Sequence, residues 1–233
     1  MRKVGRAVAG LLPFVVLVTA GGAAFAAGSV ANWQGVYVGA QGGYGFGTAG
    51  AKNGASPDPA LQLSPTGWVG GGQIGANWQY QNNSVFGVEA NFDATGMTAT
   101  GTNSFSPDGG ITHATASETQ NVDSLGAFRA RFGYSVGQVM PYIVGGVAFG
   151  IGSRKVTQTS GNCLMCSGSA SKTYTGWTAG AGAEVALDSH WSIRGEYSYV
   201  DLGTQNFMVP GPGGGTDVHL TANLVTGALN YRW

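Results

Sequence analysis

An alternation of apolar and polar residues recurs along the length of this chain. In the final stretch LVTGALNYRW, the apolar residues Leu229, Tyr231 and Trp233 alternate with the polar residues Asn230 and Arg232. A period of two is that of a β-strand, whose successive side chains point to opposite faces. This strand therefore separates an apolar environment from a polar one.

Eight such segments follow one another, at about 33–47, 66–80, 84–95, 120–136, 140–152, 172–187, 191–203 and 219–233. Their connections alternate in length. Residues 48–65, 96–119, 153–171 and 204–218 form long loops, whereas QNN, VGQ and DSH form short turns. This alternation is typical of outer-membrane barrels, whose long loops lie outside the cell. An even number of strands then places both termini in the periplasm.

The composition favours a membrane environment. Charged residues make up 9% of the chain, and Gly accounts for 42 of the 233 residues, whereas soluble domains carry roughly 25% charge. A closed barrel satisfies its backbone hydrogen bonds between strands, so it can cross a membrane without long apolar helices. We therefore predict an all-β fold, an eight-stranded antiparallel up-and-down transmembrane β-barrel with four long extracellular loops.

The first residues have the pattern of a secretory signal peptide. Arg2, Lys3 and Arg6 precede an apolar run, and small residues lead to a cleavage site after Ala26. We assign residues 1–26 to the signal peptide and 27–233 to one outer-membrane barrel domain. Removing the leader takes away three of the 11 basic residues and none of the 11 acidic ones, which leaves a formal charge of −3. This charge does not favour nucleic-acid binding.

Charged side chains share one parity of the predicted strands. In VDSLGAFRARFGY, Val122 and Phe128 belong to the apolar set, whereas Asp123, Arg129 and Arg131 belong to the other. A basic side chain on the lipid face near the midplane costs about 2–4 kcal/mol, so the charged parity must face inward. We predict a lumen charge cluster of four acids and four bases: Glu89, Asp93, Glu184, Glu196, Arg129, Arg131, Arg194 and Arg232.

The turn DSH allows a prediction of register. A three-residue hairpin loop places Leu187 opposite Trp191 and, three residues further along each strand, Glu184 opposite Arg194. We expect these two charges to be cross-strand partners inside the barrel. Eight strands enclose a space that side chains can fill, which predicts a packed lumen. Four inward glycines would make room for the arginines: Gly39, Gly71, Gly75 and Gly182.

Aromatic residues near the strand ends predict two girdles at the membrane interfaces. The periplasmic girdle would contain Trp33, Trp78, Tyr80, Tyr134, Trp191, Tyr231 and Trp233, and the outer girdle Tyr44, Phe46, Trp68 and Tyr199. The alternative interpretation is that these are core aromatics of a soluble β-sandwich.

Several stretches resemble a known family. The signal peptide, WQGVYVGAQGGYGFG, FRARFGY, MPYIVGGVAFG and the end GALNYRW are similar to the small surface-antigen barrels of Gram-negative outer membranes, known as porin-family, outer-membrane immunogenic or opacity-type proteins. The resemblance implies insertion by the barrel assembly machinery, which recognises a C-terminal strand ending in an aromatic residue. Leu229, Tyr231 and Trp233 would form that signal, with Trp233 in place of the common Phe.

Cysteine and histidine residues are the remaining candidates for chemistry. Cys163 and Cys166 lie in CLMC within a predicted loop, where an exported chain would form a local disulfide. A thioredoxin-like redox site or a metal site would need neighbours that this loop lacks. Among His113, His190 and His219, only His219 is placed to reach a lipid. We assign no catalytic residue, cofactor or metal ligand, and we predict that the chain is not an enzyme.

The long loops are rich in Gly, Ser, Thr, Asn and Pro, a composition that suits exposed connections. Lys52, Arg154, Lys155 and Lys172 lie in or beside them and could meet lipopolysaccharide phosphates. We predict a structural barrel with a packed lumen, a surface antigen that contacts outer-membrane lipid and lipopolysaccharide. The alternatives are a narrow porin-like channel for small solutes, an adhesin that binds a host or surface ligand through its loops, and a lipid-modifying enzyme.

Overall fold

The computed structural model describes residues 31–53, 62–105, 114–160, 167–207 and 216–233 of the chain. Within them it contains nine strands: β1 (Gly35–Asn53), β2 (Gln62–Leu63), β3 (Thr66–Gln79), β4 (Ser84–Phe105), β5 (Ala114–Tyr134), β6 (Val139–Ser160), β7 (Gly168–Ala186), β8 (Trp191–Phe207) and β9 (Thr216–Arg232). No helix among these residues is long and apolar enough to cross a membrane.

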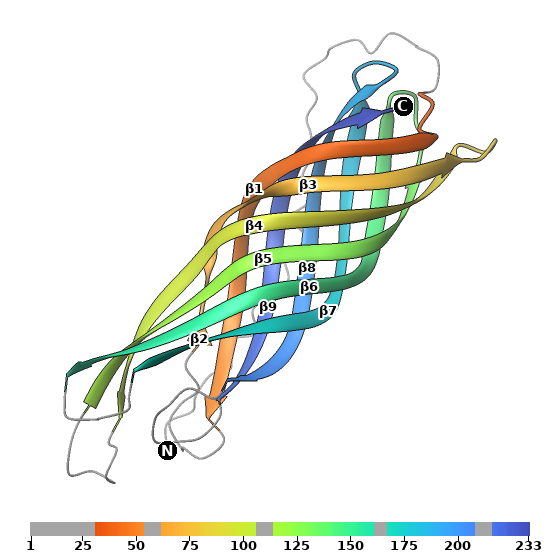
Figure 1. Cartoon of the computed structure of the whole chain (residues 1–233). Coiled ribbons are helices and arrows are strands. Elements are labelled where there is room, and N and C mark those ends of the chain that lie inside the picture. The colour runs from red at the N-terminus through yellow and green to blue at the C-terminus, as the bar shows by residue number, and fades with distance from the viewer. Residues whose placement is uncertain (1–30, 54–61, 106–113, 161–166, 208–215) are drawn as a thin grey trace, which may run out of the picture.

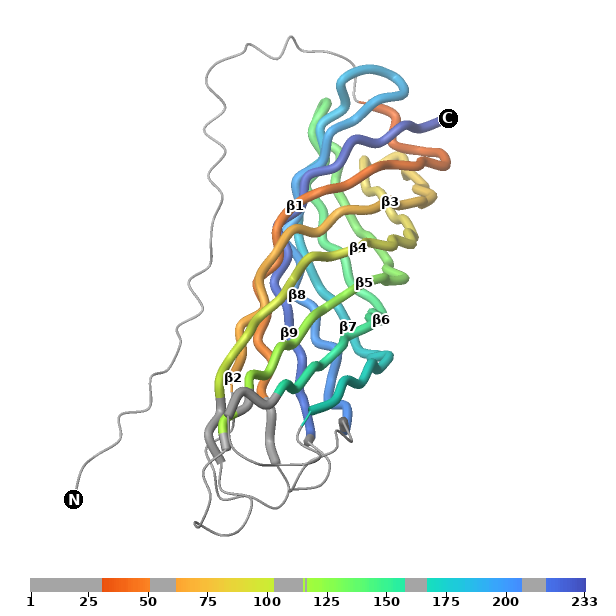
Figure 2. Tube along the Cα trace, turned by 60° about the vertical axis from the view of Figure 1, so that its left-hand side comes forward, coloured from red at the N-terminus to blue at the C-terminus, as the bar shows by residue number. Residues whose placement is uncertain are grey.

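The eight long strands form one closed antiparallel ring, with each strand beside its neighbour in sequence (Figure 1). The ring closes where β1 pairs with β9 along the whole of β9, from Tyr37↔Arg232 to Asn53↔Thr216. β2 contributes two residues that pair with β1. Figure 2 shows the same ring from another side as a barrel longer than it is wide. The predicted up-and-down barrel is confirmed.

The three short turns gather at one end of the barrel, which we call the hairpin end, and the other strand ends form the loop end (Figure 1). At the DSH turn, the N–H of Leu187 donates to the carbonyl of Trp191 at 2.9 Å. This hairpin sets Glu184 directly opposite Arg194, so the predicted register is confirmed. Asn83 and Gly137 adopt φ angles of 65° and 62° in the other two turns, where Asn and Gly tolerate a left-handed backbone.

Large apolar side chains cover the outside of the barrel. Ile74, Phe92, Phe128 and Ile143 are each more than half exposed, and they come from four strands. A soluble domain rarely exposes so continuous an apolar surface. The outward parity that the sequence predicted for these strands is therefore the one found, and it provides the face that lipid covers.

The strands extend further at the loop end than the sequence predicted. The predicted 96–119 loop is mostly strand, because β4 continues to Phe105 and β5 begins at Ala114. In this region the polarity of the two faces is inverted, with Thr98 and Thr100 exposed outside and Met97 buried inside. A barrel that rises out of lipid into water needs an apolar inside and a polar outside. The hydroxyl-rich sequence had wrongly indicated a loop.

A β-bulge corrects the predicted facing of two residues. Asp123 was expected inside and Val122 on the lipid face, but Asp123 is exposed and Val122 is 1% exposed. The reason is an extra residue in β5 between Val122 and Ser124, which shifts its register against β6. A bulge of this kind reverses which side chains face inward.

At the loop end the ring separates into two sheets. Pairing between β7 and β8 ends at Trp177↔Asp201, whereas β6 and β7 stay paired as far as Val156↔Gly168. Similarly, β3 and β4 part after Thr66↔Thr98, although β4 remains paired with β5. The described loop end therefore consists of β4 to β7 on one side and β8, β9, β1 and β2 on the other (Figure 1).

Candidate functional site: the interior of the barrel

All eight residues of the predicted lumen charge cluster are buried, with exposed fractions of 6% or less. Neighbouring strands supply them at matching heights, since Glu89 on β4 lies directly opposite Arg129 on β5. Because every inward side chain of a barrel points toward one axis, long side chains from distant strands can also meet there.

Four of these residues form a ring of ion pairs. Glu89 accepts bonds from Arg129 and, at 2.7 Å, from Nη1 of Arg194. Nη1 of Arg129 lies 2.5 Å from Oε1 of Glu196, and Nη2 of Arg194 lies 3.7 Å from Oε2 of the same residue. The ring joins strands β4, β5 and β8 across the lumen. Buried charges in low dielectric are stable only when they are paired in this way.

Glu184 does not form its ion pair with Arg194, although the two residues are opposite in the ladder. Its Oε2 accepts a bond from Arg131, while Oε1 accepts bonds from Ser192 at 2.5 Å and from Asn230 at 3.0 Å. The predicted cross-strand pairing with Arg194 is present in the ladder, but the ion pair of Glu184 is with Arg131. Arg194 instead extends to Glu89, which the curvature of the barrel brings within reach.

Two tyrosines complete the network. Tyr37 donates to Oε2 of Glu89 at 2.6 Å, and Tyr142 donates to Oε2 of Glu196 at 2.7 Å. The guanidinium of Arg131 lies 4.0 Å from the centre of the Tyr142 ring. Such a cation over an aromatic face is attracted by the electron-rich ring. The carboxylates of the ring are thus held on two sides.

The inward glycines make room mainly for these tyrosines and for amides. A Cβ at Gly75 would lie 2.5 Å from the hydroxyl of Tyr37, and one at Gly182 would lie 2.6 Å from that of Tyr142. A Cβ at Gly39 would overlap the Asn230 amide. No arginine atom is among the nearest neighbours of these three Cβ positions, so the prediction that the glycines make room for the arginines is wrong.

Asp93 and Arg232 are the two cluster members outside any ion pair among the described residues. Asp93 accepts bonds from the amide of Gln41, at 2.7 and 2.9 Å, and from that of Asn91 at 2.6 Å. Arg232 stacks on Trp33, with its guanidinium carbon 5.0 Å from the ring centre. The cluster is balanced in number, but one acid and one base stand apart.

Trp33 belongs to the interior and not to the predicted periplasmic girdle, because it is fully buried. Its backbone N–H donates to Gln79 at 2.7 Å, and its indole N–H donates to Ser135 at 3.0 Å. It packs with Met140 and other apolar residues at the hairpin end. A polar partner for the indole and an apolar pocket for the ring make the inside the more favourable location. The other predicted girdle residues face outward or are half-buried.

The loop-end half of the interior is apolar, which the sequence analysis missed. A cluster of buried side chains fills the space between the two sheets, including Met97, Leu125, Tyr174, Leu202 and Leu220. Its members come from all eight long strands, and Met97 and Val218 lie in segments that the sequence analysis had assigned to loops. The sequence did contain a signal for it, because apolar and polar residues continue to alternate in these segments, with the apolar residues on the inward parity.

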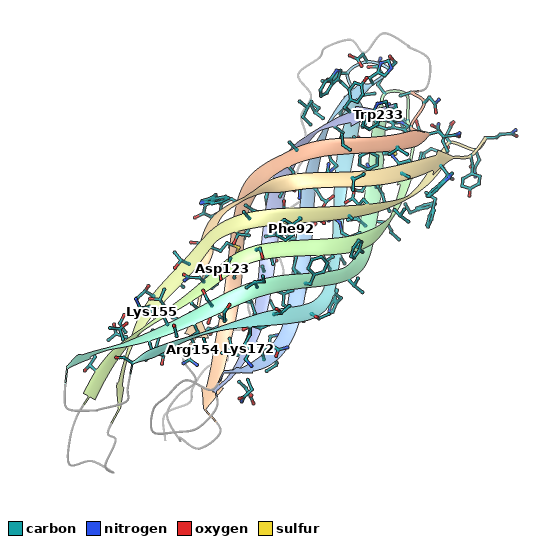
Figure 3. The ribbon with its side chains drawn as sticks, viewed as in Figure 1. Phe92, Asp123, Arg154, Lys155, Lys172 and Trp233 are labelled. Carbon is teal, nitrogen blue, oxygen red and sulfur yellow. The ribbon has the colours of Figure 1, made fainter. Side chains whose placement is uncertain are left out.

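Arg154 also faces inward, which corrects its assignment to an exposed loop. It is 6% exposed and donates to Glu118 at 2.6 Å. Lys155 and Lys172 are exposed on β6 and β7, and Lys52 belongs to β1. Figure 3 shows Asp123, Lys155 and Lys172 together on the loop-end half of the barrel. The predicted Cys163 and Cys166 lie outside the described residues, as does His113.

His219 is exposed at the loop end, as predicted, with its Nδ1 3.1 Å from the hydroxyl of Thr204 and its Nε2 3.6 Å from Asp201. At the hairpin end, Leu229 and Trp233 face outward and Tyr231 packs edge-on against Trp233, with ring centres 5.2 Å apart. This is the surface of the predicted assembly signal.

Comparison with known proteins identifies the family to which this barrel belongs. The family described as outer membrane protein beta-barrel domain matches residues 14–232. The chain belongs to this family. As a member of the outer membrane beta-barrel family, it is a protein of the outer membrane.

Two relatives have names of the same kind. The chain is 31% identical to the 31 kDa outer-membrane immunogenic protein of Brucella melitensis over 185 residues, 76% of this chain and 74% of the relative. It is 30% identical to the 25 kDa outer-membrane immunogenic protein of Brucella abortus over 187 residues, 77% of this chain and 70% of the relative. The predicted resemblance to small surface antigens is confirmed.

Among solved structures, the barrel is similar to the outer membrane protease OmpT of Escherichia coli. The TM-score is 0.51 at 8% identity, covering 87% of this chain and 98% of that one. At this identity the likeness shows the fold alone.

Proposed function

We propose that this outer membrane beta-barrel family member is a structural barrel with a closed lumen. In this proposal its hairpin end and both termini lie in the periplasm, its loop end lies outside the cell, and no part of it acts as an enzyme. The observation that carries the proposal is the ring of Glu89, Arg129, Glu196 and Arg194, which crosses the lumen between three strands. Charges paired at these short distances attract each other more strongly than either of them would attract an ion that passes through the lumen.

Two further layers support a closed lumen. Toward the loop end, the apolar cluster around Met97 and Leu202 leaves an ion without polar partners. Toward the hairpin end, Trp33 is fully buried and is hydrogen-bonded to Gln79 of β3 and to Ser135, the residue that follows β5. A water path would have to displace all three layers in series.

Planar-bilayer conductance tests this proposal. Refolded protein, verified by a heat-modifiability gel to contain closed barrels, should insert without stable current steps. A matched variant in which Glu196→Ala and Arg129→Ala remove half of the ring should conduct more than the native protein. Stable ohmic steps from the native barrel would instead support the narrow-channel alternative.

Contact with lipopolysaccharide is the second part of the proposal. The exposed outer face of β4 to β7 at the loop end carries Lys155 among hydroxyl side chains such as Thr98 and Thr173, with the acid Asp123 nearby (Figure 3). Lys172 is also exposed, but it lies opposite Gly152 on the inward parity of β7, where β7 has parted from β8. Ammonium groups attract the phosphates of lipopolysaccharide, and hydroxyls can bond its sugars. The names of the immunogenic relatives are consistent with a surface antigen, and the loops remain candidates for adhesion to host or surface ligands.

Charge changes at these exposed positions should act with opposite signs. We expect the double variant Lys155→Gln, Lys172→Gln to bind lipopolysaccharide vesicles more weakly, and Asp123→Asn to bind them more strongly, because an acid repels phosphate. Raising salt should reduce the difference, since exposed charges are screened over a Debye length of about 10 Å at 0.1 M. Equal binding by all variants would remove phosphate contact from the proposal.

Insertion by the barrel assembly machinery is proposed from Leu229, Tyr231 and Trp233. Their outward aromatic and apolar side chains lie on the last strand, beside the seam where β9 closes onto β1.

A further inference from the structure

The hairpin end contains a recess that the closed-barrel function does not use. Its volume is about 450 Å³, and its lining includes Gln34, Gln138, Asp188, Ser189, His190 and Arg232. Small-molecule sites typically have volumes of about 300–1,000 Å³. Arg232 connects the recess to the buried Trp33, on which its guanidinium stacks.

Arg232 is the unusual member of this lining. Each of the other arginines in the described part of the chain lies within salt-bridge distance of a carboxylate: Arg129, Arg131, Arg154 and Arg194. Arg232 is 4% exposed, yet no described side chain accepts a hydrogen bond from its guanidinium. Among the described side chains, the one that contacts the guanidinium of Arg232 is Trp33, on which it stacks. A buried cation with no carboxylate within salt-bridge distance is costly.

The fold holds this cation in position. The backbone N–H of Arg232 donates to the carbonyl of His190 at 2.8 Å, and Arg232 pairs with Tyr37 across the seam of the ring. Trp33 covers one face of the guanidinium. The N–H groups along the guanidinium edge therefore remain for a ligand. A guanidinium edge matches the two oxygens of a carboxylate or a phosphate.

Asp188 indicates which kind of anionic ligand the recess favours. Its Oδ1 accepts two backbone bonds at 2.7 Å each, from Trp191 and His190, and these bonds lower its pKa. Asp188 is therefore ionised at neutral pH. A dianionic phosphate in the recess would be repelled by this carboxylate, whereas a ligand that also carries an ammonium group would be attracted by it.

We infer that the recess binds an α-amino carboxylate, with its carboxylate on Arg232 and its ammonium group toward Asp188. Gln138 and Ser189 supply neutral donors and acceptors beside them. In the periplasmic orientation of the proposed function, such a group would come from a free amino acid or from the peptide of the cell-wall polymer. This source depends on the proposed function, but the binding chemistry does not.

Calorimetry on the refolded mature chain in detergent micelles tests the site. The probes are D-alanine, N-acetyl-alanine, which lacks the ammonium group, alanine amide, which lacks the carboxylate, and inorganic phosphate. We expect D-alanine to bind most tightly, N-acetyl-alanine more weakly, and the other two not at all. Tighter binding of phosphate than of D-alanine would overturn the ligand class. Absence of heat from every probe at millimolar concentration would overturn the site.

Variants assign the roles. Arg232→Gln should weaken D-alanine binding by about tenfold or more, since a hydrogen bond to a charged group contributes about 1.5–3 kcal/mol. Arg232→Lys should restore part of it, because the charge remains and the fork is lost. Asp188→Asn should weaken D-alanine binding and leave N-acetyl-alanine binding unchanged. Unaltered D-alanine affinity in Arg232→Gln would refute the assignment.

Exposed Gln138 provides a variant that does not disturb the interior. Gln138→Trp should fill the recess and abolish binding, while Lys155→Gln, at the far end of the barrel, should bind as the native protein does. Retained binding in Gln138→Trp would exclude the recess even if Arg232→Gln did not fold. A soluble cell-wall peptide that binds more tightly than D-alanine would identify the polymer as the source. Because micelles have no sides, these results are independent of orientation and conductance.

Discussion

At the scale of single residues, the interior of this barrel depends on the absence of side chains at a few positions. Gly75 and Gly182 stand under the hydroxyl ends of Tyr37 and Tyr142, and these tyrosines hold the carboxylates of the ion-pair ring. Glycine is needed at these positions because its missing side chain provides the space that the tyrosine hydroxyl occupies. The same residue type on the lipid face, as at Gly195, has no atom of another residue within 4 Å of the Cβ position.

The two kinds of glycine should respond differently to the same change. We expect Gly75→Ala to destabilise the barrel by about 1–3 kcal/mol, as overpacking does, because its Cβ would lie 2.7 Å from the carbonyl of Val88 as well as against Tyr37. Gly195→Ala should be neutral or stabilising by up to about 1 kcal/mol, since it restricts the unfolded chain. Urea unfolding in lipid vesicles measures both. Similar losses at the two sites would contradict this explanation.

At the scale of elements, the strand β5 combines two environments. From Phe128 to Tyr134 its outward side chains meet lipid, and before Asp123 its outward side chains are polar. The bulge at Asp123 marks the change. An extra residue there keeps Val122 in the apolar cluster and places a carboxylate outside, at the level where lipid gives way to sugar and water.

Thiol labelling can test this inversion. In a background with Cys163→Ser and Cys166→Ser, we expect Asp123→Cys to react rapidly with a water-soluble maleimide, whereas Val122→Cys should react at least about tenfold more slowly because its side chain is enclosed. Phe128→Cys, on the lipid face, serves as a control for reagent access. Faster reaction at position 122 than at 123 would restore the sequence-based parity.

This element also shows where sequence reasoning succeeded and where it stopped. The barrel, its strand order and the Glu184↔Arg194 register were predictable, because a period of two with charges on one parity leaves few registers. The bulge was not, since one added residue has no local signature in VDSLGAF. The strand extensions were missed because Thr and Ser indicate either loops or water-facing strands. The partners of Arg131 and Arg194 were missed because they lie across the lumen on strands that are not adjacent.

At the scale of the whole molecule, charge is balanced in number but divided by place. The ring of ion pairs and the Glu184–Arg131 pair occupy the middle, and Asp93 faces the apolar loop-end half through amide partners. Arg232 stands at the opposite end. The eight buried charges are therefore of two kinds. Six form ion pairs with one another, whereas Asp93 and Arg232 contact uncharged side chains.

These two kinds should differ in their contribution to stability. Glu89→Gln leaves both Arg129 and Arg194 short of a carboxylate, and breaking a buried pair typically costs about 3–5 kcal/mol. Asp93→Asn removes a charge that no arginine contacts, so the loss should be about 1 kcal/mol or less. Unfolding in vesicles, followed by the heat-modifiability shift, compares them directly. If Asp93→Asn proved as costly as Glu89→Gln, the stability of this barrel would depend on its total charge. If only Glu89→Gln is costly, it depends on which side chains meet across the lumen.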